Sequence, residues 1–286
     1  MTNEPAPSVF DRRVTPARGD IAARHLQGKV SAERFVDGER KVVVEPSAPL
    51  RHEPVPDAPL DTEVLLGEAV TVYDVTDEGW AWVQLEDDGY VGWIPIGALG
   101  PFAAAPTHRV SALRTLALSA PSVKAAPTRA LPLGARLAVA GQQGEFAITD
   151  RGDFIPSRHL APVRSREADY VGVAERFVGV PYLWGGKTAL GIDCSGLVQL
   201  ALQACGVACP RDSDMQERAL GVPVDSRQGL RRGDLVFWRG HVGIMRDPST
   251  LLHANAFHMA VASEALADAL ARIRVTEGEP TAIRRL

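Results

Sequence analysis

The sequence has few cysteines, no long basic run and no long apolar run. Only three of its 286 residues are cysteine, namely Cys194, Cys205 and Cys209. This odd and sparse set excludes a disulfide framework, and it falls short of the four ligands of a zinc site built from thiolates. Lysine and arginine number 31 against 35 aspartate and glutamate residues, which gives a net charge of −4. Because binding to a nucleic-acid backbone needs clustered positive charge, we expect no nucleic-acid partner.

Segments that direct a chain to a membrane are missing as well. No run of about 18 apolar residues occurs, so no membrane-spanning helix is expected. The first residues read MTNEPAPSVF, an acidic and proline-broken start in place of the basic start and apolar run of a secretory signal. We therefore expect a cytoplasmic protein without a membrane partner, while the oligomeric state is left open.

The residue patterns along the chain indicate several domains. Hydrophobic residues make up 45% and charged residues 23% of the chain, which is a normal balance for globular domains. Residues 1–45 are rich in Pro, Arg and Ala, and we expect a short helix from Asp20 to Leu26 and packing of this segment on the domain that follows. Residues 46–102 hold short β-rich runs separated by polar turns such as Asp87-Asp88-Gly89. This pattern predicts a small closed β-barrel.

Part of the barrel pattern returns later in the chain. Leu66-Gly67-Glu68 is echoed by Leu133-Gly134-Ala135, and Trp93-Ile94-Pro95 is echoed by Phe154-Ile155-Pro156. A repeated pattern of this kind indicates a repeated structural unit. Residues 103–163 are therefore predicted to form a second, degenerate barrel.

Residues 164–286 show a different pattern from the barrels. Apolar residues at helical spacing predict two helices, over Glu167–Val178 and Cys194–Ala204. Strand-like runs follow over Asp234–Trp238, His241–Met245 and Leu251–Ala254. Helices followed by an antiparallel sheet make an α+β domain.

Cys194 is the first candidate for chemistry, because it follows a glycine-rich loop and opens an apolar helix. The N-terminal end of a helix has free N–H groups and a partial positive charge, and both favour a thiolate. A nearby imidazole would lower the thiol pKa further, and the thiolate is the nucleophilic form of cysteine. We therefore expect a lowered pKa at Cys194.

Two histidines are placed to serve this thiol. His241 begins one strand-like run and His253 lies within the next. If the two runs are adjacent antiparallel strands, both imidazoles reach one face of the sheet. His241 would then take the thiol proton, and His253 would orient the His241 ring, which is the nucleophile, base and orienter arrangement of many hydrolases.

Each of these residues also has a structural interpretation. A cysteine at a helix start is more often a buried packing residue than a nucleophile, and a histidine among apolar residues is usually a hydrogen-bonded core group. His258 is the best competing imidazole, and we interpret it as structural or pocket-lining. Taken together and in this order, Asp-Cys-Ser-Gly, His-Val-Gly and Leu-Leu-His-Ala favour the catalytic interpretation.

The segment from about residue 165 to 265 resembles the NlpC-type cell-wall peptidases, a papain-like group. The motifs that carry the resemblance are Pro-Tyr-Leu-Trp-Gly-Gly at 181–186, Asp-Cys-Ser-Gly at 193–196, Arg211 to Ser213, Arg-Gly-Asp-Leu-Val-Phe-Trp at 232–238, His-Val-Gly-Ile at 241–244 and His253. The resemblance implies Cys194 as nucleophile, His241 as base and His253 as the third, polar member. It also implies that Tyr182 and the Cys194 amide stabilise the oxyanion. The expected fold is an α+β papain-like catalytic domain preceded by two small all-β barrels, which resemble bacterial SH3 domains.

The order of SH3-like barrel and NlpC-type domain is similar to that of γ-D-glutamyl-L-diamino-acid endopeptidases of the dipeptidyl-peptidase type. Such enzymes cut between D-Glu and the diamino acid of murein peptides that have a free N-terminal L-Ala. The resemblance implies a group of substrate-binding residues, namely Asp193, Ser195, Ser213, Glu53 and Tyr90. Glu53 and Tyr90 keep the alternative interpretations of a solvated carboxylate and a barrel-packing ring. Neither a metal nor another cofactor is expected.

Four functions remain open on the sequence alone. The leading one is a cytoplasmic cysteine peptidase that recycles murein peptides. The others are an exported hydrolase of the intact wall, a catalytically inactive module that binds wall peptides, and an acyl- or amide-transferase on a related scaffold.

Overall fold

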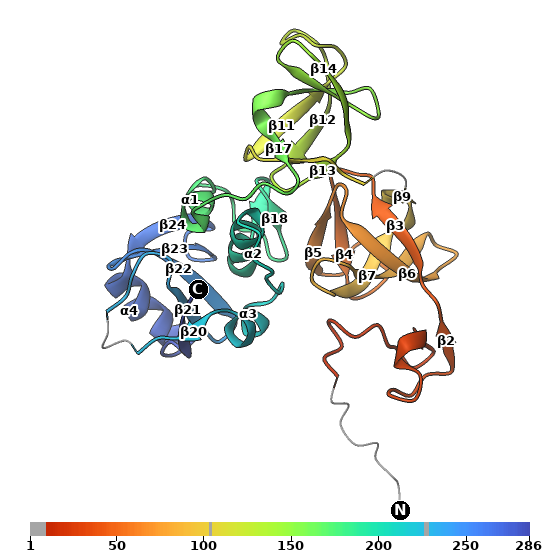
Figure 1. The fold of residues 1–286 in the computed structure, drawn as a ribbon. Coiled ribbons are helices and arrows are strands. Elements are labelled where there is room, and N and C mark those ends of the chain that lie inside the picture. Colours follow the sequence, from red (N-terminus) through yellow and green to blue (C-terminus); the bar gives the residue numbers. More distant parts are fainter. Residues whose placement is uncertain (1–9, 103–104, 226–228) are drawn as a thin grey trace, which may run out of the picture. The chain divides into compact units, whose positions relative to one another are not determined.

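The computed structural model describes residues 10–102, 105–225 and 229–286 (Figure 1). The chain divides into two compact units, Met1–Ala104 and Ala105–Leu286. Within the described residues, none of the helices has the length and apolar character needed to cross a membrane.

The first unit is a small antiparallel β-structure. Its sheet has the strand order β5-β4-β8-β7-β6-β3-β9. The elements are β1 (Ile21–Ala23), η1 (Arg24–Leu26), β2 (Arg34–Val36), β3 (Glu39–Val43), β4 (Ser47–Arg51), β5 (Leu60–Leu65), β6 (Ala69–Val75), β7 (Trp80–Leu85), β8 (Val91–Pro95), η2 (Ile96–Ala98) and β9 (Leu99–Pro101). Apolar side chains such as Val43, Leu50 and Ile94 alternate along these strands and form the buried core.

Two features of the first unit differ from the sequence-based expectations. Strand β3 begins at Glu39 and pairs with both β6 and β9, so the sheet starts before the expected boundary at residue 46. The expected helix from Asp20 to Leu26 is wrong, because β1 pairs in parallel with β2 and only a short 3₁₀-helix follows. Asp20 accepts hydrogen bonds from Arg18 at 2.7 and 3.0 Å, and it caps no α-helix.

The N-terminal residues cover one aromatic face of this barrel. The guanidinium of Arg18 lies 4.5 Å from the centre of the Trp82 ring and 4.7 Å from that of Trp93. Ile21 packs into the same apolar cluster, which also contains Trp80. A cation over an indole face is attractive and excludes water from it. These rings are therefore buried by the chain's own N-terminal segment.

The β-strands of residues 105–163 repeat the strand order of the first unit. One sheet has the order β12-β11-β16-β15-β14 and a second has the order β13-β10-β17, which matches the first unit if β13 and β14 together replace β6. The elements are β10 (His108–Val110), β11 (Arg114–Leu118), β12 (Pro127–Pro132), β13 (Arg136–Leu137), β14 (Val139–Gln143), β15 (Phe146–Thr149), β16 (Phe154–Pro156), η3 (Ser157–His159) and β17 (Leu160–Pro162).

Equivalent hydrogen bonds strengthen this correspondence. The Gly67 amide donates to the Val43 carbonyl at 2.9 Å, and the Gly134 amide donates to the Val110 carbonyl at 3.0 Å. Both glycines have positive φ, 79° and 89°, a region that glycine enters without steric cost. The sequence echo around these two glycines thus coincides with the same local turn.

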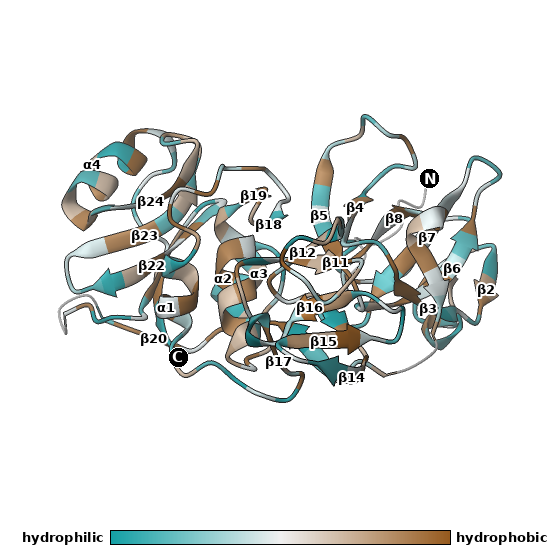
Figure 2. Cartoon of the chain, turned by 90° about the horizontal axis from the view of Figure 1, so that it is seen from above, coloured by the Kyte–Doolittle hydropathy of each residue, from teal (hydrophilic) through white to brown (hydrophobic). Residues whose placement is uncertain are grey.

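The remaining residues form a sheet with helices on both sides. The six-stranded sheet has the order β20-β25-β21-β22-β23-β24. The elements are α1 (Tyr170–Glu175), β18 (Lys187–Thr188), β19 (Gly191–Ile192), α2 (Cys194–Ala204), α3 (Ser213–Ala219), β20 (Val222–Pro223), β21 (Leu235–Trp238), β22 (His241–Asp247), β23 (Thr250–Asn255), β24 (Ala260–Ala265), α4 (Leu266–Thr276) and β25 (Ala282–Arg285). The sheet lies between α2 and α4 in Figures 1 and 2.

The two long helices, α2 and α4, differ in how much of their surface is buried. Nearly every residue of α2 is buried, whereas α4 buries only Ala269 and Ile273 and alternates polar with apolar residues (Figure 2). The predicted helix over Cys194–Ala204 agrees with α2, and the predicted helix over Glu167–Val178 is shorter, because Asp169 caps it at Tyr170. A buried α2 gives Cys194 a rigid position at its first turn.

Candidate active site

Cys194 lies at the first turn of α2, next to the start of β22. Asp193 is the N-cap of the helix and accepts the Gly196 amide at 2.6 Å, which fixes where the helix begins. The Cys194 sulfur accepts hydrogen bonds from the amides of Val242 and Ser195 and is nearly buried, at 7% exposure. Because Val242 directly follows His241, this contact brings the thiol to the strand that carries the predicted base.

The expectation of a lowered thiol pKa is wrong for the free protein. Burial, followed by the negative charge of Asp193, raises the pKa of Cys194 to about 12, and the hydrogen bonds to its sulfur offset only part of this. Burial also lowers the pKa of His241 to about 3, with His253 adding to the effect. At neutral pH the thiol is thus protonated and the imidazole is neutral. If His241 serves as the base, it would therefore take the thiol proton during attack, without a preformed ion pair.

The two catalytic histidine candidates lie in direct contact. Nε2 of His241 is 2.8 Å from Nδ1 of His253, and both rings are buried. The contact arises because β22 and β23 are antiparallel neighbours, with Ile244 opposite Leu252. The spacing of the two histidines on adjacent strands therefore produces the contact that the sequence analysis required.

Two further residues, to which the sequence analysis gave no role, extend the polar contact between His241 and His253. Nε2 of His253 lies 2.7 Å from Oε1 of Glu264 on β24. Arg272 on α4 donates to both carboxylate oxygens of Glu264, at 2.6 and 2.8 Å. A chain of polar contacts thus runs from His241 to a guanidinium on α4. A planar guanidinium that binds a carboxylate through two parallel bonds holds it in one orientation.

Tyr182 is positioned by the turn between β23 and β24. Its amide donates to the Met259 carbonyl at 2.9 Å, and Met259 has the unusual φ of +49°. Burial first, then the charges of Cys194 and Asp193, raise the pKa of Tyr182, so the phenol stays protonated. Its hydroxyl has no hydrogen-bond partner within the described residues, which leaves it available to a substrate oxygen.

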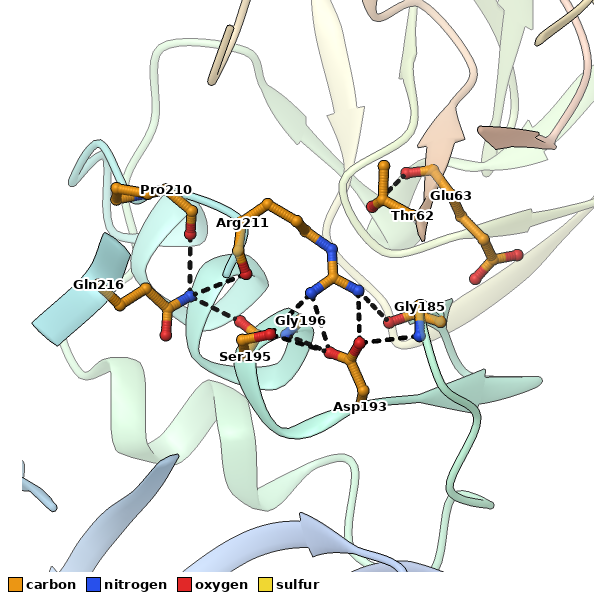
Figure 3. A network of polar contacts seen from close by, with 10 residues as sticks. Thr62, Glu63, Gly185, Asp193, Ser195, Gly196, Pro210, Arg211 and Gln216 are labelled. Atoms are coloured by element: carbon orange, nitrogen blue, oxygen red, sulfur yellow. Dashed lines mark hydrogen bonds and ion pairs between the residues drawn. The ribbon is translucent and has the colours of Figure 1, made fainter. Parts of the chain in front are cut away.

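Asp193 takes part in a buried ion pair with Arg211 (Figure 3). Arg211 donates to the two Asp193 oxygens at 2.7 and 3.0 Å, and its guanidinium also donates to Ser195 Oγ at 2.8 Å. The Gly185 amide donates to the same carboxylate at 2.9 Å. The charge of Asp193 is therefore neutralised inside the protein, where Asp193 holds the loop and the helix that present Cys194.

The other predicted substrate residues of the second unit lie near this ion pair. Ser195 belongs to the network just described, and Ser213 is the buried first residue of α3. Gln216 of α3 donates to the Ser195 carbonyl at 2.9 Å, which ties α3 to the start of α2. Contacts of Asp193, Ser195 and Ser213 with a substrate remain predictions.

Glu53 and Tyr90 belong to the first unit. Tyr90 is 6% exposed and packs in the barrel core with residues such as Val43 and Ile94, in agreement with its alternative interpretation as a packing ring. The Glu53 side chain is 65% exposed on the segment after β4, 3.8 Å from His52. A role of either residue in substrate binding remains a prediction.

Within the described residues, one group of side chains near the two histidine candidates has metal-ligating atoms close together. His253, His258 and Glu264 place such atoms within 4.8 Å of one another. However, Arg272 donates to both oxygens of Glu264, and His258 Nδ1 lies 3.0 Å from Asn255 Oδ1. A guanidinium already neutralises the carboxylate, so the donor set fits a hydrogen-bonded line better than a cation site.

Comparison with known protein families matches two segments of the chain. Residues 179–275 match the NlpC/P60 family, and residues 50–99 match the bacterial dipeptidyl-peptidase SH3 domain. The predicted SH3-like domain and the predicted papain-like α+β domain are thereby confirmed.

Several bacterial enzymes are similar in sequence. The γ-D-glutamyl-L-lysine dipeptidyl-peptidase of Bacillus cereus is 28% identical over 205 residues, which cover 63% of this chain and 60% of that protein. The protein of the same name from Bacillus subtilis is 28% identical over 229 residues, which cover 68% of this chain and 72% of that protein. Dipeptidyl-peptidase 6 of Lysinibacillus sphaericus is 34% identical over 101 residues, which cover 35% of this chain and 36% of that protein.

The three-dimensional likeness extends over most of the chain. The crystal structure of an NlpC/P60 family protein from Bacillus cereus has a TM-score of 0.72 at 21% sequence identity, covering 86% of this chain and 99% of that chain. At this identity, the likeness shows a shared fold.

Proposed function

We propose that this chain, which carries an NlpC/P60 cysteine peptidase domain after a bacterial dipeptidyl-peptidase SH3 domain, hydrolyses the bond between γ-D-Glu and a diamino acid in murein peptides with a free N-terminal L-Ala. The observation that carries the proposal is the thiol of Cys194 at the start of α2, beside the strand on which His241 contacts His253. The names of the two Bacillus relatives support the substrate class.

In the first half of the reaction, the Cys194 sulfur attacks the γ-carbonyl carbon of the D-Glu residue and its proton passes to His241. The oxyanion that forms accepts hydrogen bonds from the Cys194 amide and the Tyr182 hydroxyl. The carbon–nitrogen bond then breaks, and His241 returns the proton to the departing amine of the diamino acid. A thioester on Cys194 remains.

In the second half, water attacks the thioester carbon and gives a proton to His241. The carbon–sulfur bond breaks, the γ-carboxyl group of the dipeptide is released, and the sulfur regains the proton from His241. The first half-reaction begins with the proton of the thiol, which is protonated at rest, and the second with a proton of water; both protons pass to His241.

A preference for peptides with a free amine is the finer part of the proposal. A site built to bind an ammonium rejects analogues that lack it, because its acceptors are then left unpaired. Glu53 and Tyr90 stay the proposed amine contacts, while Asp193 would act mainly through the loop and helix that it holds. Such an enzyme would process released peptides and spare the wall.

The deciding experiment compares four peptides: L-Ala-γ-D-Glu linked to L-Lys or to diaminopimelate, each with a free or an acetylated N-terminus. We expect release of L-Ala-D-Glu and the free diamino acid, identified by mass, from the unblocked peptides alone. Equal cleavage of the blocked peptides would remove the amine preference and leave the peptidase assignment. No cleavage of any peptide would refute the proposed substrate class.

The recycling role, the cytoplasmic location and the second barrel are further parts of the proposal. The repeated strand order of residues 105–163 supports a second SH3-like barrel. Cell fractionation with an antibody against the chain tests the location, and incubation with intact wall sacculi tests the competing function of an exported hydrolase. Release of peptides from sacculi at a rate comparable to that from free peptides would favour the competing function.

A further inference from the structure

We propose that Glu264, held by Arg272, is a positioning residue that selects the tautomer of His253 and thereby keeps Nδ1 of His241 free to accept the thiol proton. The catalytic consequence rests on the proposed function, whereas the tautomer assignment rests on the contacts alone. Neither Glu264 nor Arg272 was singled out by the sequence motifs.

The carboxylate of Glu264 contacts both His253 and Arg272. Although burial alone would raise it, the pKa of Glu264 is lowered by the hydrogen bonds from Arg272 and His253, so Glu264 is ionised. An ionised carboxylate only accepts hydrogen bonds. Nε2 of His253, 2.7 Å from Oε1 of Glu264, must therefore carry the proton of this contact.

The His253 ring lies between Glu264 and His241. Burial lowers the pKa of His253 to about 4, so the ring is neutral near pH 7 and has one N–H donor and one bare nitrogen. With the proton on Nε2, Nδ1 is the bare nitrogen and accepts from Nε2–H of His241 across 2.8 Å. In a neutral His241 ring, Nδ1 then carries the lone pair that a general base needs.

The contact between the histidines does not choose a tautomer by itself. A distance of 2.8 Å is equally satisfied if His253 donates from Nδ1 and His241 accepts at Nε2. That arrangement would place the proton of His241 on Nδ1 and remove its basic site. The His253 side chain is fully buried, so bulk water cannot decide between the two arrangements. Glu264 is the charged group whose contact selects one of the two tautomers of His253.

Arg272 stabilises the form of Glu264 that selects this tautomer of His253. Its two donors occupy Oε1 and Oε2 of Glu264, which keeps the carboxylate ionised and in plane. The Arg272 guanidinium also lies 4.3 Å from the centre of the Phe257 ring, so it is held on its other side. The orientation of the His241 ring is therefore linked, through two strands, to a residue on α4.

The substitution Glu264→Gln separates this role from simple packing. The glutamine fills the same volume, but Arg272 donates to both oxygen positions of Glu264, so the amide can turn either its oxygen or its N–H₂ toward His253. The tautomers of His253 and His241 are then no longer fixed, and in part of the molecules Nδ1 of His241 carries a proton. We expect kcat on the tripeptide to fall several-fold with KM changed little. Glu264→Ala, which leaves neither an acceptor nor a donor, should lose the same selection.

A readout that needs no substrate keeps this test apart from that of the proposed function. In ¹⁵N-detected NMR of the histidine rings, Nδ1 of His241 should be unprotonated in the unaltered protein and partly protonated in Glu264→Gln. Alkylation of Cys194 by iodoacetamide should slow in the same variant. Circular dichroism and thermal unfolding establish that the variants fold.

A matched control lies nearby in sequence. Glu279 forms an exposed ion pair with Arg274 at 2.8 Å, and Glu279→Gln should change neither the NMR signals nor kcat. A His241 ring whose Nδ1 stays fully unprotonated in both Glu264→Gln and Glu264→Ala would overturn the inference. So would an unchanged kcat in both variants, because the carboxylate that selects the tautomer is then absent.

Discussion

Nε2 of His253 lies 2.7 Å from Oε1 of Glu264, and the two residues come from neighbouring strands, β23 and β24. In the register of these strands, His253 is opposite Ala262, so Glu264 is a diagonal neighbour on the same face. The contact extends the pair of histidines into a line that ends on α4. The base of the proposed reaction is therefore oriented by three secondary-structure elements, beyond the strand that carries it.

The first prediction concerns the nucleophile. Cys194→Ala and Cys194→Ser should both abolish hydrolysis of the tripeptide, because a serine hydroxyl is a far weaker nucleophile beside an imidazole of such low basicity. The measurement is product release by mass, with folding checked by circular dichroism. Cys205→Ser is the matched control, since Cys205 ends α2 and is only partly buried, and it should retain full activity. Turnover that persists in Cys194→Ala would refute the nucleophile assignment.

The second prediction concerns the pH dependence of stability. Burial lowers the pKa of His241 to about 3 and that of His253 to about 4, from 6.5 in the unfolded chain. Above pH 6.5 the imidazoles are neutral in both the folded and the unfolded state, so they do not change the free energy of unfolding with pH. Below pH 6.5 the unfolded chain binds protons that the folded chain does not, so the free energy of unfolding falls as the pH drops toward 4.

The substitution His241→Gln isolates this contribution from that of the acidic residues. Between pH 6 and pH 4.5 its free energy of unfolding should fall less steeply than that of the unaltered protein, by up to about 1.4 kcal/mol per pH unit, which is the effect of one proton. Urea unfolding followed by tryptophan fluorescence at several pH values measures the slope. Identical slopes for the two proteins would show that His241 titrates normally in the folded state.

Most of the backbone around the site is predictable from local sequence. The apolar spacing after Cys194 and the short apolar runs around His241 and His253 gave α2, β22 and β23 to within a few residues. The predicted and observed bounds of these segments agree because their apolar residues are the ones that are buried: one side of each segment is apolar and packs in the core. The expected helix from Asp20 to Leu26 failed because strand pairing and the ion pairs of Arg18 compete with a weak helical pattern.

The polar part of the site is less predictable because it depends on register and burial. Glu264 and Arg272 meet His253 only through the alignment of β23 with β24 and the packing of α4, and no short motif encodes either. Arg211 belongs to one of the motifs that resemble the NlpC-type peptidases, yet its ion-pair partner Asp193 is 18 positions away in the sequence. The direction of the thiol pKa was wrong for a similar reason, since the helix end favours the thiolate locally while burial of Cys194 opposes it more strongly.

The third prediction concerns the buried ion pair in Figure 3. Arg211→Met should destabilise the catalytic domain by about 3–5 kcal/mol, because it leaves the carboxylate of Asp193 buried without its cation. Arg218→Met is the matched control: Arg218 forms an exposed pair with Asp214 on α3, and its loss should cost less than about 1 kcal/mol. Urea unfolding at pH 7.5 measures both. Equal stabilities of the two variants would contradict the structural importance of the pair.

The fourth prediction concerns Tyr182. Its amide is anchored to the Met259 carbonyl, and its raised pKa keeps the hydroxyl protonated at any working pH. If that hydroxyl donates to the oxyanion, Tyr182→Phe should lower kcat about 10²- to 10³-fold and leave KM nearly unchanged, because the bond forms mainly in the transition state.

A tyrosine far from the site provides the comparison for Tyr182. Tyr73→Phe removes a hydroxyl that donates to Gln84 at 3.3 Å in the first unit, and it should leave kcat and KM unaltered. Steady-state kinetics on the tripeptide, with both variants checked for folding, makes the measurement. If Tyr182→Phe raised KM and preserved kcat, the hydroxyl would bind the ground state, and the oxyanion would depend on the Cys194 amide and on donors from the substrate itself. The amide belongs to the free N-terminal end of α2, so its contribution would survive both substitutions.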